Sequence, residues 1–337
     1  MLRDPSEVRA WVLTDGKAGD EQQCLGVTDA LGLEPELRRV RPRAPFAWLM
    51  PWGPVDPKER PSAQGSPLAP PFPDVAVASG RRAVPYLKAL KRASGGRTYT
   101  VFLKDPRTGP RAADLIWAPE HDRLTGGNVI ATLTPPHRIS PARIAAARLE
   151  PDPRLSDLPR PRVAVLAGGS SRHHRFTEED VARFAASLAR LAETGAGLMI
   201  TASRRTPPTL RAEFVGLAAR HGGFFWDGSG ENPYVALLAL ADSIVVTADS
   251  FNMVGEAAAT GTPIFVFEPS GGHPKLKAFL DGLARYGAVH PFPGSLEARP
   301  YPPLDSTLIV ARAIAEGLAR HRRALGLPEP AFVSESP

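Results

Sequence analysis

The chain has 337 residues, of which 43% are hydrophobic and 23% charged, and its formal net charge is +6. One hydrophobic core rarely serves a chain of this length, so we expect two globular domains rather than one domain or a disordered chain. The single cysteine, Cys24, excludes a disulfide framework and a cysteine-based zinc site. The longest apolar stretches, such as residues 243–248 and 263–267, are too short to span a bilayer. Residues 1–7 lack the apolar run of a secretory signal, so a cytoplasmic location is expected.

The excess of positive charge lies in the first half of the chain. Residues 1–158 hold 23 Lys and Arg against 18 Asp and Glu, whereas residues 159–337 hold 18 against 17. The basic residues are scattered, which is typical of a solvated surface. The alternative is peripheral contact with the anionic inner face of a membrane, or with an acidic acceptor. The sequence has no zinc finger, RRM-type motif or basic helix, so no nucleic-acid partner is expected.

Short strand-like segments alternate with helix-like ones in the first part of the chain. The expected strands cover residues 8–14, 74–79, 98–103 and 114–117, and the expected helices lie near 20–31 and 81–93. Such alternation is typical of βαβ units around a parallel sheet. Residues 42–73 are rich in Pro, Gly and Ser and predict an irregular insertion, in which residues 46–50 are apolar enough to dock on a core.

Four prolines between residues 151 and 161 mark the expected domain boundary, because proline blocks helix continuation and stiffens linkers. The alternation then restarts, and Thr177 is placed to cap the first helix of the second domain. The expected strands are 162–167, 198–201, 243–247 and 263–267, and the expected helices are 178–193, 209–221, 252–260, 275–286 and 305–325. The sequence therefore predicts an α/β protein with two Rossmann-like domains in tandem.

The loop after the first strand of the second domain is the clearest local signal. Gly168, Gly169 and Ser170 stand between an apolar strand and a capped helix. Glycines there let the backbone approach a phosphate, and a helix N-terminus offers N–H donors to it. The loop is neither a G-x-G-x-x-G nor a Walker A sequence, and a plain strand–helix turn needs the same residue types. A phosphate site and a structural turn are therefore both compatible with this loop.

A second loop with cations follows the strand 198–201. It contains Ser203, Arg204 and Arg205, and a guanidinium at the carboxyl end of a strand can hold a diphosphate in its planar fork. The alternative is an exposed arginine pair without a ligand.

The run from Glu256 to Pro263 resembles the E-A-x-A-x-G-x-P segment of GT-B nucleotide-sugar glycosyltransferases. In that fold the glutamate commonly accepts hydrogen bonds from the ribose hydroxyls, and the loop before it contacts phosphate through backbone N–H groups. The resemblance implies that Glu256 binds ribose. It also implies that the donor site includes residues of the preceding strand end and helix start, namely Thr247, Asp249, Ser250 and Met253. The alternative is that Glu256 only complements the dipole of its helix.

Residues 14–23 place ionisable groups and two glycines directly after the first strand, at the usual mouth of a doubly wound sheet. Asp15 can take the proton of an acceptor hydroxyl in an inverting transfer. Lys17 beside it would keep that carboxylate ionised or hold an anionic acceptor. In the alternative, Asp15 forms a turn and Asp20 caps the first helix.

The chain as a whole resembles the mitochondrial fission ELM family, whose bacterial and plant members are classed as GT-B glycosyltransferases. The matching stretches are residues 11–23, 122–135, 165–171, 200–205, 232–234, 247–255 and 262–277, in the expected order. The resemblance implies two Rossmann-like domains facing a cleft: an acceptor-side domain, 1–158, and a donor-binding domain, 159–304, with Lys275 among the donor contacts. It further implies that the C-terminal helix, 305–330, packs back on the first domain.

The expected function is a metal-independent glycosyltransferase. The chain offers no DxD carboxylate pair for a divalent ion, and helix N-termini after Gly169 and Ser250, with Arg204 or Lys275, can stabilise a leaving diphosphate. No cofactor is expected beside the nucleotide-diphosphate sugar itself, and a cell-envelope glycan or a lipid-linked molecule is the candidate acceptor. Two alternatives stay open, a nucleotide-sugar epimerase on the same fold and a non-catalytic adaptor of the membrane surface.

Overall fold

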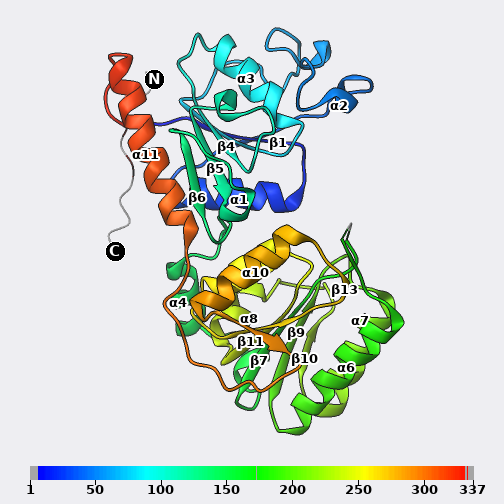
Figure 1. The fold of residues 1–337 in the computed structure, drawn as a ribbon. Coiled ribbons are helices and arrows are strands. Elements are labelled where there is room, and N and C mark those ends of the chain that lie inside the picture. The colour runs from blue at the N-terminus through cyan, green and yellow to red at the C-terminus, as the bar shows by residue number, and fades with distance from the viewer. Residues whose placement is uncertain (1–6, 172, 331, 333–337) are drawn as a thin grey trace. The chain divides into compact units, whose positions relative to one another are not determined.

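The computed structural model describes residues 7–171, 173–330 and 332 of the chain. The chain divides into two compact units, a first unit of Met1–Arg138 with Ser306–Pro337 and a second unit of Ile139–Asp305. In the described residues each unit contains a six-stranded parallel sheet covered by helices (Figure 1). The division falls between residues 138 and 139, ahead of the proline-rich segment 151–161 in which the sequence predicts it.

The displaced boundary has a packing reason. Helix α4 (Pro141–Leu149) lies against α8 (Tyr234–Leu240) of the second unit. The guanidinium of Arg148 donates to the carbonyl oxygen of Ala239 at 3.0 Å. Residues 139–158, including the short helix α5 (Pro153–Ser156), therefore belong to the second unit rather than to the first.

The sheet of the first unit has the strand order β2-β1-β3-β4-β5-β6. Its strands are β1 (Ala10–Thr14), β2 (Glu36–Arg39), β3 (Val75–Ser79), β4 (Tyr99–Leu103), β5 (Leu115–Pro119) and β6 (Val129–Thr132). All neighbours pair in parallel, with Trp11 of β1 opposite Ala76 of β3 and Glu36 of β2. The sequence predicts β1, β3, β4 and β5, whereas the two edge strands β2 and β6 were not predicted.

Alternate side chains of this sheet enter two hydrophobic clusters, as the period of a strand requires. One cluster joins Val12 and Val77 to α1 (Ala18–Ala30) and α11 (Ser306–Ala324). The other joins Trp11 and Ala76 to α3 (Ala83–Ala93). Short 3-10 turns at Pro110–Ala112 and Glu120–Asp122 connect the later strands.

The C-terminal helix, α11, belongs to the first unit, which confirms the expectation from the family resemblance (Figure 1). Val310, Ile314 and Leu318 are fully buried in the cluster that also contains Val12. Gly317 allows the close approach of this helix to β4, because a Cβ at that position would stand 2.0 Å from the hydroxyl oxygen of Tyr99.

The insertion 42–73 is mostly irregular, as predicted, but contains α2 (Phe46–Leu49) and a 3-10 turn at Pro57–Glu59. The prediction that residues 46–50 dock on a core is confirmed, because Met50 is fully buried and Phe46 packs against the same cluster as α3.

The sheet of the second unit has the order β10-β9-β7-β11-β12-β14. Its strands are β7 (Arg162–Ala167), β9 (Gly197–Ala202), β10 (Phe224–Trp226), β11 (Ser243–Thr247), β12 (Ile264–Phe267) and β14 (Val289–Phe292). A separate antiparallel pair joins β8 (His174–Arg175) to β13 (Ser270–Gly271). The remaining helices are α6 (Glu178–Glu193), α7 (Pro208–His221), α9 (Phe251–Ala258) and α10 (Pro274–Tyr286).

The predicted cap of α6 is present and complete. Thr177 accepts a hydrogen bond from the Asp180 backbone, and the Asp180 carboxylate accepts one from the Thr177 backbone in return. Behind this cap Phe184 is fully buried, with its ring centroid 4.3 Å from that of Phe267. None of the helices in the described residues is both long enough and apolar enough to cross a membrane.

The burial of α11 predicts a large loss of stability when its apolar face is truncated. We expect Ile314→Ala to lower the free energy of unfolding by about 2–5 kcal/mol, the usual range for removing a buried aliphatic side chain. Ile309 on the same helix is 55% exposed, and Ile309→Ala should change the free energy by less than about 0.5 kcal/mol. Urea denaturation of both variants measures this, and equal losses would contradict the packing of α11.

Candidate functional site

The second sheet reverses its winding between β7 and β11, which are neighbours in the strand order. In open α/β sheets ligands bind outside the carboxyl ends of the strands at such a point. The loop with Gly168 and Gly169 follows β7, and Asp249 and Ser250 follow β11. The structure therefore brings together two of the loops that the sequence singles out separately.

A buried carboxylate, that of Asp249, connects these loops. Gly168 donates its backbone N–H to Thr247 Oγ1 at 2.7 Å, and Gly169 donates to Asp249 Oδ2 at 3.1 Å. Thr247 in turn donates its hydroxyl to Asp249 Oδ1 at 2.7 Å. A Cβ on Gly168 would stand 2.0 Å from Asp249 Oδ1, so only glycine admits the carboxylate here. The two glycine amides thus have partners within the protein, which corresponds to the structural interpretation of this loop.

The third loop, after β9, is tied to the same carboxylate. Arg205 donates to Asp249 Oδ2 at 2.7 Å and to the carbonyl oxygens of Gly169 and Ser170, at 3.2 Å each. The Asp249 side chain is 0% exposed, whereas that of Arg205 is 45% exposed. Arg205 therefore compensates the negative charge of the buried Asp249 carboxylate. The neighbouring Arg204 is exposed and has no hydrogen bond or ion pair in the described part of the chain. Ser203 supports the turn by accepting the Arg205 N–H at 3.1 Å.

Helix α9 begins at the end of this network and carries Glu256. Ser250 caps the helix by accepting the backbone N–H of Met253 at 3.4 Å. Glu256 Oε2 accepts a hydrogen bond from the Tyr234 hydroxyl at 2.6 Å, and no described residue donates to the other oxygen. Burial raises the pKa of the Glu256 carboxyl to about 7, although the hydrogen bond from Tyr234 acts in the opposite direction. The sequence singles out Glu256, and Tyr234 lies in the matching stretch 232–234, but the contact between the two side chains is not predicted.

A cavity of about 480 Å³ lies beside the Gly168–Ser170 loop. Its lining comes from two segments, Ser170, Ser171, His173, His174 and Arg175 on one side and Ser270 and Gly271 on the other. The rings of His173 and His273 are in contact, with centroids 4.2 Å apart and planes tilted by 45°, and His273 accepts the backbone N–H of Lys275 at 3.2 Å. Lys275, the second residue of α10, therefore lies near this cavity through its neighbour His273. Burial lowers the pKa of His174 below its usual value.

The first unit has a comparable cluster where β1, β3 and β4 end. Asp15 follows β1, and its side chain is only 3% exposed. Lys17 donates to Asp15 Oδ2 at 2.9 Å, while Asp15 Oδ1 is buried without a hydrogen-bond partner in the described residues. Gly80, at the end of β3, has a φ of +95°, and a Cβ there would stand 3.0 Å from Asp15 Oδ1.

Asp20 does not cap α1, which corrects the expectation from the sequence. The N-cap position is Lys17, without a side-chain hydrogen bond, and Asp20 is the third residue of the helix, in its first turn. There Asp20 is buried and forms an ion pair with Lys104, at the end of β4. Lys104 has a φ of +93°, a strained conformation for a residue with a side chain. The sequence does not place Gly80 or Lys104 in this cluster, because their proximity to Asp15 and Asp20 depends on which strands become neighbours. The positive φ of Lys104 has no signature in composition or periodicity.

A model of the family described as "Mitochondrial fission ELM1" matches residues 18–318. The chain belongs to this family. The mitochondrial fission protein ELM1 of Arabidopsis thaliana is 27% identical over 274 residues, which are 73% of this chain and 64% of that protein. The matched region is thus less than two thirds of the plant relative's length.

Solved structures resemble this ELM1-family chain over nearly its whole length. A UDP-N-acetylglucosamine 2-epimerase from Listeria monocytogenes has a TM-score of 0.51 at 10% identity, with 96% of this chain and 92% of the other covered. The S. aureus MnaA–UDP co-structure has a TM-score of 0.50 at 12% identity, with 97% and 100% covered. At such identities the likeness concerns the fold, which is the GT-B-like pair of Rossmann-type units expected from the sequence.

The raised pKa of Glu256 makes the stability of this ELM1-family protein depend on pH. The folded protein holds the proton with a pKa of about 7, against a usual value of 4.5, so the folded state is the stronger proton binder. Its free energy of unfolding should therefore decrease as the pH rises from about 5 to about 8, by no more than about 3 kcal/mol from this group.

Glu256→Gln removes that titration, so the stability of this variant relative to the wild type should increase over the same interval. Glu213→Gln, an exposed change on α7, is the matched control and should follow the wild type. Urea denaturation across the pH interval tests this, and parallel profiles for wild type and Glu256→Gln would contradict it.

Proposed function

We propose that this ELM1-family protein is a glycosyltransferase that uses a nucleotide-diphosphate sugar and needs no metal ion. The observation that carries the proposal is Glu256, a half-buried carboxyl on the helix that starts at the winding reversal of the second sheet. One oxygen of Glu256 is bound by Tyr234, and no described residue donates to the other. A ribose hydroxyl that donates to this second oxygen would meet an acceptor already oriented by the protein.

The donor diphosphate would lie against the start of α9 and the cavity beside Ser170. Backbone donors and the helix dipole at a helix start favour an anion. Lys275 and the exposed guanidinium of Arg204 would add positive charge as the leaving diphosphate develops its own. Gly168 and Gly169 contribute in this scheme by shaping the loop, since their amides are bound to Thr247 and Asp249.

Asp15 would act on the acceptor side. A hydroxyl acceptor is a weak nucleophile, and a carboxylate within hydrogen-bond reach helps to remove its proton as the new bond forms. In support of this role, Asp15 Oδ1 is buried without a partner in the described residues, and Lys17 holds the other oxygen. The acceptor class we propose is a cell-envelope glycan or a lipid-linked molecule.

A nucleotide-sugar epimerase is the second candidate. The two similar structures are an epimerase by name and a complex with UDP, and an epimerase needs acid and base groups around the sugar. His173, His174 and His273 gather beside the 480 Å³ cavity. Formation of an epimeric nucleotide sugar without any acceptor would favour this activity over transfer.

Donor binding is tested by thermal unfolding with UDP, GDP, ADP and CMP and their sugar derivatives. At least one should raise the melting temperature, because a ligand of the folded state stabilises it by mass action. Glu256→Gln should weaken the affinity for that ligand about ten- to hundredfold, the scale of a hydrogen bond to a charged group. Glu213→Gln should leave it unchanged. No shift with any nucleotide would contradict the proposal and favour a non-catalytic adaptor of the membrane surface.

The role of Asp15 is tested by Asp15→Asn, which keeps the hydrogen-bonding geometry and removes the base. We expect donor binding and folding to stay close to wild type and release of the nucleoside diphosphate at saturating donor to fall about a hundredfold or more. Asp29→Asn, at an exposed ion pair near the C-terminal end of α1, is the control. Near-normal turnover by Asp15→Asn would assign this residue to the turn alone.

A further inference from the structure

The insertion 42–73 exposes three large apolar side chains within a few residues. Trp48 is 76% exposed, Leu49 52% and Trp52 69%. These exposures do not come from a loose segment, since Met50 between them is fully buried in the core of the first unit. Solvent-facing side chains of this size that gather in one place mark an interaction surface.

The insertion is fastened by its own carboxylates. Asp56 is 1% exposed on its side chain and binds Arg43 and the backbone N–H of Lys58. Glu59 accepts hydrogen bonds from the Tyr86 hydroxyl of α3 and from the backbone of Arg41. Both acidic groups are thereby bound, and in the described part of the chain neither forms an ion pair with Lys88 or Arg92 of α3.

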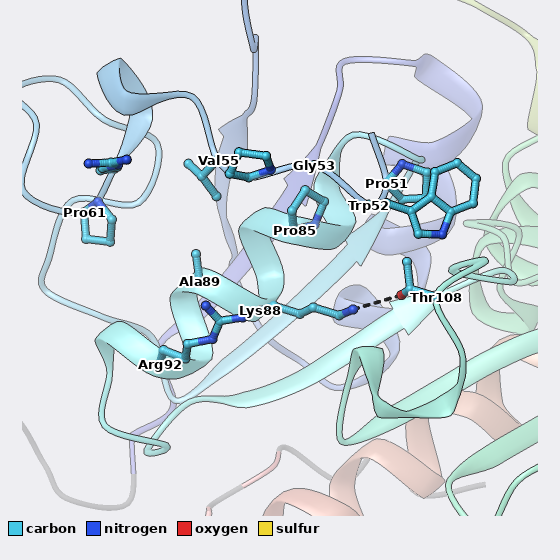
Figure 2. Close-up of a pocket in the computed structure, with 12 residues that line it drawn as sticks. Pro51, Trp52, Gly53, Val55, Pro61, Pro85, Lys88, Ala89, Arg92 and Thr108 are labelled. Atoms are coloured by element: carbon cyan, nitrogen blue, oxygen red, sulfur yellow. Dashed lines mark hydrogen bonds between the residues drawn. The ribbon is translucent and has the colours of Figure 1, made fainter. Parts of the chain in front are cut away.

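A pocket of about 600 Å³ lies between this insertion and α3 (Figure 2). Its lining includes the apolar residues Pro51, Trp52, Val55, Pro61 and Pro85. The rest carries cations, and no Asp or Glu lines the pocket. In Figure 2, Trp52 and Thr108 lie at one end, with the Lys88 side chain extended toward Thr108.

Three basic side chains, Arg60, Lys88 and Arg92, line this pocket. Lys88 donates to Thr108 Oγ1 at 3.0 Å, and burial together with the nearby Arg92 lowers its pKa. Arg60 and Arg92 are exposed and make no ion pair in the described part of the chain. The pocket therefore offers an anion three cations together with aromatic and proline side chains.

We propose that this surface docks the first unit on an anionic phospholipid bilayer. Trp48, Leu49 and Trp52 enter the interfacial region, where amphipathic indoles are favoured. Arg60, Lys88 and Arg92 bind the phosphates of anionic headgroups, which attract each basic side chain near the surface. The inference is independent of the proposed nucleotide site.

A second copy of the chain is a weaker match for the same surface. Two indoles offer at most about 500 Å² of apolar area. Even with the smaller area of one leucine added, the total stays below the about 800 Å² per partner of a stable protein interface. A bilayer has no such requirement, because a few inserted side chains and a cluster of cations together suffice for peripheral binding.

The test uses the full chain with phosphatidylcholine vesicles, with and without phosphatidylglycerol. We expect cosedimentation with the anionic vesicles and little with the neutral ones, together with a blue shift of tryptophan emission. Trp48→Ala/Trp52→Ala should weaken binding about tenfold or more and remove most of the blue shift. Arg60→Gln/Arg92→Gln should weaken binding to the anionic vesicles about tenfold or more and abolish their advantage over neutral ones.

Matched controls come from exposed positions elsewhere in the chain. Leu149→Ala removes a side chain that is 83% exposed in the second unit, and Arg312→Gln removes a charge from the exposed face of α11. Both should bind as the wild type does. Circular dichroism of the surface variants confirms that they remain folded, since none of the replaced side chains is buried.

Three outcomes would overturn the proposal. Unchanged vesicle binding by either double variant would show that this surface does not bind the membrane. Displacement by inorganic phosphate at constant ionic strength would identify a free-anion site instead. A concentration-dependent dimer that Trp48→Ala/Trp52→Ala abolishes would assign the surface to a second copy of the chain.

Discussion

The carboxylate of Asp249 is the group on which the loops of the second unit depend. A fully buried carboxylate is costly unless its oxygens receive hydrogen bonds, and here the donors come from Thr247, Gly169 and Arg205. Gly169 and Asp249 are 80 residues apart in the chain, and their hydrogen bond connects the loop after β7 to the loop after β11, where the sheet reverses its winding. The position of Gly168 follows from the same constraint, because a Cβ there would occupy the place of the carboxylate. The start of α9, and with it Glu256, is thereby fixed relative to β7.

The first unit also contains buried carboxylates at the carboxyl ends of its strands, but their partners differ from those of Asp249. Asp20, in the first turn of α1, and Lys104, at the end of β4, form an ion pair, and Lys104 has a positive φ. Asp15 lies in the same cluster, with one oxygen on Lys17 and the other without a partner in the described residues. Asp249 has both oxygens bound by donors of the protein itself. Asp15 has one oxygen without a partner in the described residues, and the proposed proton-accepting role depends on that oxygen.

The sequence predicts the interior of both sheets and misses their edges, and the difference is physical. β1, β3, β7 and β11 are buried along nearly their whole length and therefore carry uninterrupted apolar runs. β2 is a short, polar edge strand, and β14 contains Pro291, which a central strand would not tolerate. In the candidate site, the loops are predictable because they follow strand ends. The pairs Gly169–Asp249 and Tyr234–Glu256 are not, since they depend on which strands become neighbours.

Glu256 and Asp249 stand close in sequence yet differ in what the fold supplies to them. Asp249 receives a cation and several donors, so its charge is compensated within the protein. Glu256 receives a single hydroxyl, from Tyr234, and burial raises its pKa to about 7. A folded chain gains nothing in stability from an under-compensated carboxyl, and the Tyr234 hydroxyl still fixes its direction. A carboxyl that is oriented but not saturated is the arrangement expected where a ligand is to provide the missing donor, which is why the proposed donor site is centred on Glu256 rather than on the glycine loop.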